Sequence, residues 1–340
     1  MLDIRKSVYI DNRWVGPHGL GVYCAAVQNR LCLKELDISG RPSSPWDPLR
    51  LMASMARLPK ASVVFSPGYN APLSMIRPFV FTLHDLNHID VPANGSVLKR
   101  LYYRFVIKRA CLTANRVLTG SEFSRRRIMS WSGVAADKIV KMGYGVDPVY
   151  QPNGPSYEAG HPYLLVVGSS RKPHKNDVRI VSAFSRAGID TSVKLLFTGD
   201  PTKELEEVAR RCGVEGRIRF LGRVKAEELP PLYRGALALL FPSLYEGFGL
   251  PIVESMACGT PVLTSACTGT EEVAADAAVT VDPYSIEKIA EGIERITEDS
   301  NLRDELRQKG LERAAIYNWD SVAETIRLVL EETLLESGAK

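Results

Sequence analysis

Two acids and a group of cations stand directly after short apolar runs of the sequence. Glu246 and Glu254 flank a glycine-spaced turn and a short helical pattern within residues 243–265. A second stretch, residues 168–176, places a glycine before four basic or imidazole side chains: Arg171, Lys172, His174 and Lys175. Lysine and arginine neutralise phosphate groups, and a carboxylate accepts hydrogen bonds from neighbouring hydroxyls. These residue types predict binding of a ligand that carries phosphates and hydroxyls, although the basic stretch alone is also typical of a solvated loop.

The turn after residues 238–242 is suited to close contact with a ligand. Gly247 and Gly249 allow a tight backbone turn, Pro251 favours the first turn of a helix, and Gly259 can close that helix. The start of such a helix offers free N–H groups and a positive dipole end to a phosphate. Glu254 follows about one helical turn after Pro251, where its carboxylate can accept from two adjacent hydroxyls, such as those of a ribose.

The elements that must position these residues are read from apolar runs that alternate with helical patterns. Strands are expected at residues 8–10, 63–65, 79–83, 117–118, 163–167, 194–197, 218–221, 238–241 and 261–263. Strands that are apolar throughout are typical of parallel sheets covered by helices on both faces. The fold class is therefore α/β, with two Rossmann-like, doubly wound domains whose ligands bind at the carboxyl ends of the strands. The turn-rich residues 149–161 predict a boundary near residue 155.

Composition excludes several classes of protein. The net charge of +4 is too small to favour a nucleic-acid partner. Six cysteines without a C-x-x-C pair indicate reduced, cytoplasmic usage. The first thirty residues contain no apolar core of a signal peptide, and there is no apolar run as long as the roughly 18 residues of a membrane-spanning helix. A cytoplasmic protein, soluble or peripheral on the inner face of the cytoplasmic membrane, is expected.

The stretch Ser243-x-x-Glu246-Gly-x-Gly-Leu-x-x-x-Glu254 resembles the E-x7-E signature of the retaining glycosyltransferases of family 4, which have the two-domain GT-B fold. Weaker resemblances follow the family order along the chain: Gly19-Leu-Gly-Val-Tyr23, Thr82-Leu-His-Asp85, Gly120-Ser-Glu-Phe-Ser124, Gly145-Val-Asp147, Pro173-His-Lys-Asn176, Phe197-Thr-Gly-Asp200 and Gly222-Arg-Val224. The resemblance implies an acceptor-side domain at 1–155, a nucleotide-sugar domain at 156–318, and a helix at 319–340 that returns to the first domain.

The resemblance also implies a role for each matched residue. Lys175 would hold the donor diphosphate, Glu254 the ribose, and Glu246 the transferred sugar, while Gly222 to Val224 would border the base. The expected catalytic residues are Glu246 and His84, and the expected donor-binding residues are Gly19, Arg171, Lys175, Gly222, Val224, Gly247, Phe248, Gly249, Leu250 and Glu254. Many relatives have arginines where this chain has Ser169 and His174, so Arg171 is expected to substitute for them.

Two further clusters invite other interpretations. Residues 84–90 hold two histidines and two acids, but their spacing is not a zinc pattern and the chain has no D-x-D, so neither a metal nor another cofactor is expected beside the nucleotide sugar. Residues 99–127 hold nine lysines and arginines against one acid, and Leu98, Leu101, Tyr102 and Phe105 follow one helical face. This region is either a core-packed helix with a solvated basic side or a patch that contacts anionic membrane lipids.

The resemblance thus implies a retaining, metal-independent hexosyltransferase that uses a nucleotide-diphosphate sugar, with GDP-mannose preferred on general likeness to mannosyl-type relatives. The expected acceptor is a glycan or a lipid-linked glycan, in the biosynthesis of a bacterial surface polysaccharide or glycolipid such as lipopolysaccharide. Three alternatives stay open: a nucleotide-sugar epimerase, a phosphorylase with pyridoxal phosphate, and a non-catalytic protein that binds a nucleotide sugar. The base, the sugar, the acceptor and the oligomeric state also stay open.

Overall fold

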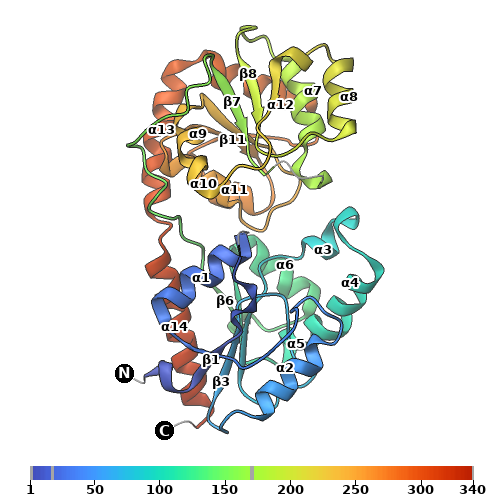
Figure 1. Cartoon of the computed structure of the whole chain (residues 1–340), viewed down its shortest axis with the longest axis vertical. Coiled ribbons are helices and arrows are strands. Elements are labelled where there is room, and N and C mark those ends of the chain that lie inside the picture. Colours follow the sequence, from blue (N-terminus) through green and yellow to red (C-terminus); the bar gives the residue numbers. More distant parts are fainter. Residues whose placement is uncertain (1–2, 17–18, 169–171, 339–340) are drawn as a thin grey trace. The chain divides into compact units, whose positions relative to one another are not determined.

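The chain folds into two compact units. The computed structural model describes residues 3–16, 19–168 and 172–338, and Figure 1 shows the course of the whole chain. The first unit joins Met1–Gly145 with Asn318–Lys340, and the second unit consists of Val146–Tyr317. No helix in the described part of the chain is long and apolar enough to cross a membrane.

Unit 1 contains a six-stranded parallel sheet in the order β2-β1-β3-β4-β5-β6. Its strands are β1 (Val8–Ile10), β2 (Lys34–Glu35), β3 (Val63–Ser66), β4 (Phe79–Thr82), β5 (Arg116–Thr119) and β6 (Ile139–Lys141). Its helices and helical turns are η1 (Ile4–Lys6), η2 (Asn12–Trp14), α1 (Gly19–Leu31), α2 (Asp47–Ala56), α3 (Asn87–Asp90), η3 (Pro92–Asn94), α4 (Val97–Tyr102), the π-helical turn η4 (Tyr103–Ile107), α5 (Lys108–Thr113), α6 (Glu122–Ser132), η5 (Ala136–Lys138) and α14 (Trp319–Glu336).

The strands of unit 1 coincide with apolar runs of the sequence. Every residue of β3 and β4 is buried, and buried strands require mostly apolar side chains. Helix α6 begins where Ser121 accepts a hydrogen bond from the N–H of Ser124, and it ends at Gly133, whose φ of 79° favours glycine. Strands β1, β3 and β4 are parallel neighbours, so their carboxyl ends lie at one edge of the sheet. Asp11, Pro67 and His84 follow these strands at that edge.

Unit 2 contains a second six-stranded parallel sheet, in the order β12-β11-β10-β7-β8-β9. Its strands are β7 (Tyr163–Val166), β8 (Lys194–Phe197), β9 (Ile218–Phe220), β10 (Ala238–Phe241), β11 (Val262–Ser265) and β12 (Val279–Val281). Its helices and helical turns are η6 (Pro173–Lys175), α7 (Asp177–Arg186), α8 (Lys203–Arg211), η7 (Glu215–Arg217), η8 (Ala226–Glu228), α9 (Leu229–Gly235), α10 (Leu250–Ala257), α11 (Thr268–Ala274), α12 (Ile286–Glu298) and α13 (Ser300–Ala315).

The helices of unit 2 form two groups, one on each face of the sheet. Helix α7 packs against α8 and α12, and helix α10 packs against α9 and α13. A core cluster of side chains from α7, α8, α12 and the strands fills the space on the first face. The predicted α/β class with two doubly wound parallel sheets is confirmed.

The division between the units differs from the expected boundary near residue 155. The N–H of Val146 donates to the carbonyl of Tyr317, both within unit 2, and the N–H of Tyr157 donates to the carbonyl of Pro231. These bonds fix residues 146–157 to unit 2, so the turn-rich stretch is packed against this unit instead of spanning freely. Helix α14 belongs to unit 1, where it packs against α1 and forms ion pairs from Asp320 to Arg30 and from Glu336 to Arg116.

Candidate active site

The central pair of the candidate site is Lys175 and Glu246 in unit 2. Strands β7 and β10 are neighbours in the sheet, so the loops that follow them meet at its carboxyl edge. Lys175 Nζ lies 2.8 Å from Glu246 Oε1, and the two side chains are only 17% and 16% exposed. The same Nζ lies 4.8 Å from the centre of the Phe241 ring. The structure thus brings together the cation and the first glutamate that the sequence singled out.

The loop after β7 is held by main-chain geometry and by one asparagine. Gly168 has a φ of 75°, and its N–H donates to Thr198 Oγ1 at 3.0 Å. Asn176, also left-handed with a φ of 68°, donates through Nδ2 to the carbonyls of Pro242 and Pro283 at 2.9 and 2.8 Å. Asn176 therefore ties the loop of Lys175 to the loops that follow β10 and β12.

Two positions of this loop bear on the expected arginine substitution. His174 is buried, and its carbonyl accepts from the N–H of Leu244 at 2.7 Å. Burial places the imidazole within the unit and not at its surface. Ser169 and Arg171 lie outside the described residues, so the expected role of Arg171 stays a prediction.

The glycine turn after β10 leads directly into helix α10. Gly249 caps the helix with a φ of 103°, and Phe248 is buried against the ring of Tyr317 in an edge-to-face contact. Leu250 is the first helical residue. A Cβ on Gly269, at the start of α11, would lie 2.3 Å from the carbonyl oxygen of Gly247, so the two loops approach each other through bare backbone. The expected turn and helix start are observed, and Gly259 follows the helix with a φ of 73°.

The second glutamate, Glu254, lies within α10 and is partly buried. The hydroxyl of fully buried Tyr233, from α9, donates to its Oε2 at 2.9 Å, and the hydroxyl of Tyr150 is a second hydrogen-bond donor. Burial raises the pKa of Glu254 to about 7, and the charge of nearby Asp147 acts in the same direction. Both tyrosine hydrogen bonds lower the pKa and offset part of this rise. Two tyrosines that the sequence did not single out therefore orient this carboxylate.

The expected base-binding segment, 222–224, lies beside a cavity of about 400 Å³. Gly222 has a φ of 68°, and its carbonyl accepts from the N–H of Gly199 at 2.7 Å. The cavity is lined by Tyr157, Leu221, Arg223, Val224, Glu227, Glu228, Pro231 and Leu232. Val224 thus borders an open space large enough for a ring system, whereas Gly222 shapes the turn that leads to it.

The expected catalytic histidine, His84, is in unit 1 at the end of β4 and is 9% exposed. Its Nε2 lies 2.9 Å from the carbonyl oxygen of Pro67, and its Nδ1 contacts the hydroxyl of Tyr144. Because a carbonyl can only accept, Nε2 carries the proton and Nδ1 accepts from Tyr144. Burial lowers the pKa of His84 to about 4, partly offset by the Pro67 hydrogen bond, so the ring is neutral near pH 7.

Gly19 and Asp85 of unit 1 also belong to the motifs that resemble the family. Asp85 accepts from the N–H of Asn87, the first residue of α3, at 2.9 Å. Gly19 is the first residue of α1. Contacts of Gly19 and His84 with a sugar stay predictions. Tyr144, which the sequence did not single out, requires Gly120, because a Cβ there would lie 1.9 Å from the Tyr144 ring.

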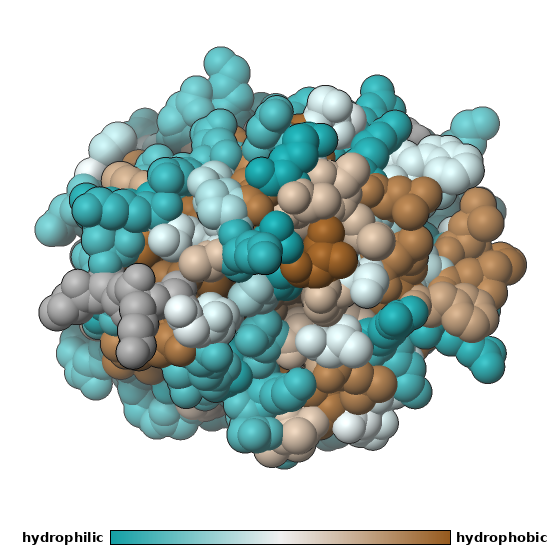
Figure 2. Space-filling view, turned by 90° about the horizontal axis from the view of Figure 1, so that it is seen from below, coloured by the Kyte–Doolittle hydropathy of each residue, from teal (hydrophilic) through white to brown (hydrophobic). Residues whose placement is uncertain are grey.

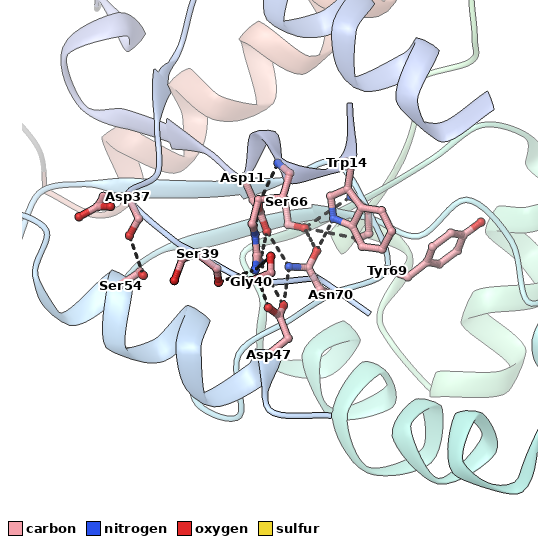
Figure 3. Close-up of polar contacts among 12 residues, drawn as sticks. Asp11, Trp14, Asp37, Ser39, Gly40, Asp47, Ser54, Ser66, Tyr69 and Asn70 are labelled. Atoms are coloured by element: carbon pink, nitrogen blue, oxygen red, sulfur yellow. Dashed lines mark hydrogen bonds and ion pairs between the residues drawn. The ribbon is translucent and has the colours of Figure 1, made fainter. Parts of the chain in front are cut away.

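A buried polar network at the same edge of unit 1 was also missed (Figure 3). Arg13 forms ion pairs with Asp11 and Asp47, each at 2.7 Å, and both carboxylates are fully buried. Asn70 donates to Asp11 at 2.7 Å and accepts from the indole N–H of Trp14 at 2.8 Å. Burial raises the pKa of Asp47, although Arg13 and Asn70 lower it. The network joins the loops after β1 and β3 to the start of α2.

The described part of the chain, residues 3–16, 19–168 and 172–338, includes the histidines and acids of residues 84–90. This part of the chain contains no group of three or more histidines, cysteines or acids placed to hold a metal ion. Among these histidines and acids, His84 contacts the carbonyl of Pro67, Asp85 accepts from the N–H of Asn87, and Asp90 forms an ion pair with Arg127 of α6.

Comparison with known proteins identifies the family. A family model described as glycosyl transferases group 1 matches residues 155–313, and one described as glycosyltransferase family 4 matches residues 21–150. O-antigen chain mannosyltransferase B of Escherichia coli is 31% identical over 276 residues, which are 77% of this chain and 72% of that relative. The chain belongs to glycosyltransferase family 4.

Further similarities agree with this assignment to family 4. O-antigen chain mannosyltransferase RfbU of Salmonella typhimurium is 28% identical over 242 residues, which are 71% of this chain and 65% of that relative. The solved structure of HepE from Anabaena, in complex with UDP and glucose, has a TM-score of 0.76 at 18% identity and covers 96% of this chain and 99% of its own. This family 4 member therefore has the GT-B fold and is a glycosyltransferase.

Proposed function

We propose that this family 4 glycosyltransferase moves a hexose from a nucleotide-diphosphate sugar to a glycan or lipid-linked acceptor, with retention of the anomeric configuration and without a metal ion. The observation that carries the proposal is the Lys175–Glu246 pair at the glycine turn before α10. Lys175 supplies positive charge for the diphosphate, and the start of α10 supplies a positive dipole end. Glu246 supplies a carboxylate beside them.

In the proposed mechanism, each charged group matches a charge that develops during transfer. The bond between the sugar and the diphosphate lengthens, so the ring becomes cationic and the leaving phosphate gains negative charge. Lys175 stabilises the leaving phosphate, and Glu246 stabilises the cationic ring more than the neutral sugar. The leaving phosphate then assists the incoming hydroxyl on the same face, which preserves the configuration. Glu254, held by Tyr233, accepts hydrogen bonds from the ribose.

The names of two relatives support a proposal for the finer identity of the substrates. Two curated relatives are named as O-antigen chain mannosyltransferases, which supports mannose as the sugar, GDP-mannose as the donor, and a growing surface polysaccharide or lipid-linked glycan as the acceptor. We place the enzyme in the cytoplasm, peripheral on the inner face of the membrane. The basic segment that begins at Lys99 supports this location through its attraction to anionic headgroups.

Two experiments test the proposal. In a thermal-shift series with GDP, UDP, GDP-mannose and UDP-glucose, a ligand bound only by the folded protein raises stability by RT ln(1 + [L]/Kd), and GDP and GDP-mannose should give the largest shifts. Proton NMR of the product should then show the anomeric configuration of the donor. An inverted linkage would overturn the retaining mechanism, and larger shifts with the uridine compounds would overturn the choice of donor.

A further inference from the structure

The cations of the basic region 99–127 divide into two classes in the structure. Four of them pair with carboxylates: Arg116 with Glu332 and Glu336, Arg125 and Arg126 with Glu122, and Arg127 with Asp90. The other five take part in none of the ion pairs between described residues: Lys99, Arg100, Arg104, Lys108 and Arg109. The uncompensated charge therefore lies on one continuous helical segment, α4-η4-α5.

The π-helical turn η4 aligns three of these cations. In an α-helix, residues four apart are rotated by about 40° at each step, so positions 100, 104 and 108 drift around the helix. In η4 the N–H of Lys108 donates to the carbonyl of Tyr103, five residues back, and the wider turn reduces this drift. Arg100, Arg104 and Lys108 accordingly line one hollow of about 410 Å³ together with Ile89 and Trp131. Lys108 Nζ lies 6.0 Å from the centre of the Trp131 ring.

Exposed apolar side chains accompany this hollow on the same segment. Val97, Leu98, Leu101 and Phe105 are 72%, 76%, 44% and 63% exposed, although a helix that packs into the core would bury them. In Figure 2, hydrophobic side chains gather along the right-hand edge of the face seen from below, on the side where Figure 1 places α4. The alternative of a core-packed helix holds for the other face of the segment, where Tyr103, Ile107 and Cys111 are buried, but it does not explain the exposed apolar residues.

We propose that Arg100, Arg104 and Lys108 form, with Trp131, a binding site for the phosphomonoester headgroup of a membrane lipid. Leu98, Leu101 and Phe105 enter the lipid layer beside it. Three cations without carboxylate partners match a phosphate that carries up to two negative charges, and guanidinium–phosphate bonds are stronger than the general attraction to a charged surface. Exposed leucine and phenylalanine next to basic residues are typical of helices that lie in the membrane interface. The site rests on the membrane location proposed above and is independent of the proposed donor chemistry.

Vesicle binding by the full-length protein tests this site. One set of vesicles contains phosphatidic acid in phosphatidylcholine, and a second contains phosphatidylglycerol adjusted to the same zeta potential. The wild type should bind the phosphatidic acid vesicles about tenfold more tightly. The variant Arg104→Gln, Lys108→Gln should lose this preference. The matched control Lys99→Gln, Arg109→Gln removes the same charge from the same segment outside the hollow, so it should weaken binding to both vesicles equally and keep the preference.

Three outcomes would overturn the proposal. The wild type could bind both kinds of vesicle equally at equal zeta potential, or bind neither. Either result would show that the protein has no site for a phosphomonoester headgroup. Identical behaviour of the two double variants leaves only a diffuse electrostatic attraction. The Leu98→Ser, Phe105→Ser variant could bind vesicles as the wild type does, while glycerol 3-phosphate fully displaces the vesicles from the protein. This result would identify a free phosphate compound as the ligand instead of a lipid. All substituted residues except Lys108 are exposed, and unchanged thermal unfolding midpoints verify that each variant is folded.

Discussion

Lys175 Nζ lies 2.8 Å from Glu246 Oε1, although the sequence assigned the two side chains to different parts of the donor. An ammonium group has three N–H donors, so one bond to Glu246 leaves the others for a phosphate oxygen. Both side chains are largely buried, which strengthens their interaction relative to a pair in water. The group that is expected to hold the phosphate therefore also positions the carboxylate that is expected to face the sugar.

A double-mutant cycle on this pair should reveal the coupling. Lys175→Ala should weaken binding of the sugar-free nucleoside diphosphate by about 1.5–3 kcal/mol, because it removes a charge-assisted hydrogen bond. Glu246→Gln should bind the nucleotide nearly normally and lower kcat, since it removes negative charge near the cationic ring. The double variant should deviate from additivity in kcat/KM by at least about 0.5 kcal/mol, as contacting residues do.

The control for this cycle is Lys172→Ala, which removes an exposed cation from the same loop. It should change nucleotide affinity by less than about 0.5 kcal/mol. Calorimetry and initial rates are the measurements. Additive effects would show that Lys175 and Glu246 act independently. An undiminished kcat in Glu246→Gln would show that this glutamate has no role in the mechanism.

Nucleotide affinity should rise with pH across the neutral range. The pKa of Glu254 is raised to about 7, and only the ionised carboxylate accepts hydrogen bonds from both ribose hydroxyls, so affinity is low below this pH and high above it. Tyr233→Phe removes a hydrogen bond that lowers this pKa, so the midpoint should move to higher pH. Glu254→Gln should remove the Glu254 component of the pH dependence and weaken binding of the sugar-free diphosphate.

Tyr163→Phe is the matched control for this pH profile. The buried hydroxyl of Tyr163 donates to the carbonyl of Leu232 at 2.8 Å, one residue from Tyr233, so its loss affects the same helix but not Glu254. Fluorescence titration with the nucleoside diphosphate at several pH values gives each midpoint. Equal midpoints in the wild type and Tyr233→Phe would show that the tyrosine does not tune this carboxylate.

Acid should destabilise the fold through His84. Its pKa is lowered from an unfolded value of 6.5 to about 4 by burial, so between these pH values the unfolded chain binds a proton that the folded chain does not. The free energy of unfolding therefore falls as the pH falls through this window, by at most about 1.4 kcal/mol per pH unit. His84→Gln should have a shallower decline in urea unfolding, whereas His161→Gln should follow the wild type, and equal slopes for all three would remove His84 as the cause.

The Arg13 network should contribute strongly to stability. Arg13→Leu leaves Asp11 and Asp47 buried without their cation, and loss of one partner of a buried pair costs about 3–5 kcal/mol. Arg57→Leu is the control, because Arg57 is 60% exposed and 3.9 Å from the exposed Asp37. It should cost less than about 1 kcal/mol. Urea denaturation measures both, and a similar small loss in each variant would contradict a structural role for the network.

The sequence predicted the interior strands well and the edge strands poorly. Residues 8–10, 194–197 and 238–241 are strands with the expected bounds, because apolar runs buried on both faces have a strong signal. The strands β2, β6 and β12 were missed. Each lies at the edge of its sheet, β2 has two exposed residues, and β12 alternates between buried and exposed positions. Such short edge strands depend on a neighbouring strand more than on their own composition.

The residues of the candidate site could be predicted where glycines and charged residues follow a strand. The hydroxyl and amide groups that hold these residues could not be predicted, because they are distant in the sequence. Lys175, Glu246 and Glu254 lie at the expected edge of unit 2. Tyr233 follows an apolar stretch that reads as part of a core, so its bond to Glu254 has no signal in the sequence. The partners in the network of Arg13 are as far as 57 residues away along the chain, a separation that no local pattern reports.

The return of α14 to unit 1 has a consequence for how the gene could be rearranged. The chain passes between the units twice, at 145–146 and at 317–318, so neither residues 1–155 nor any other single N-terminal fragment contains the whole of unit 1. Helix α14 contacts η1, which allows a short linker between them. A circular permutant that begins at Val146 and ends at Gly145 would make both units continuous and leave one covalent passage instead of two.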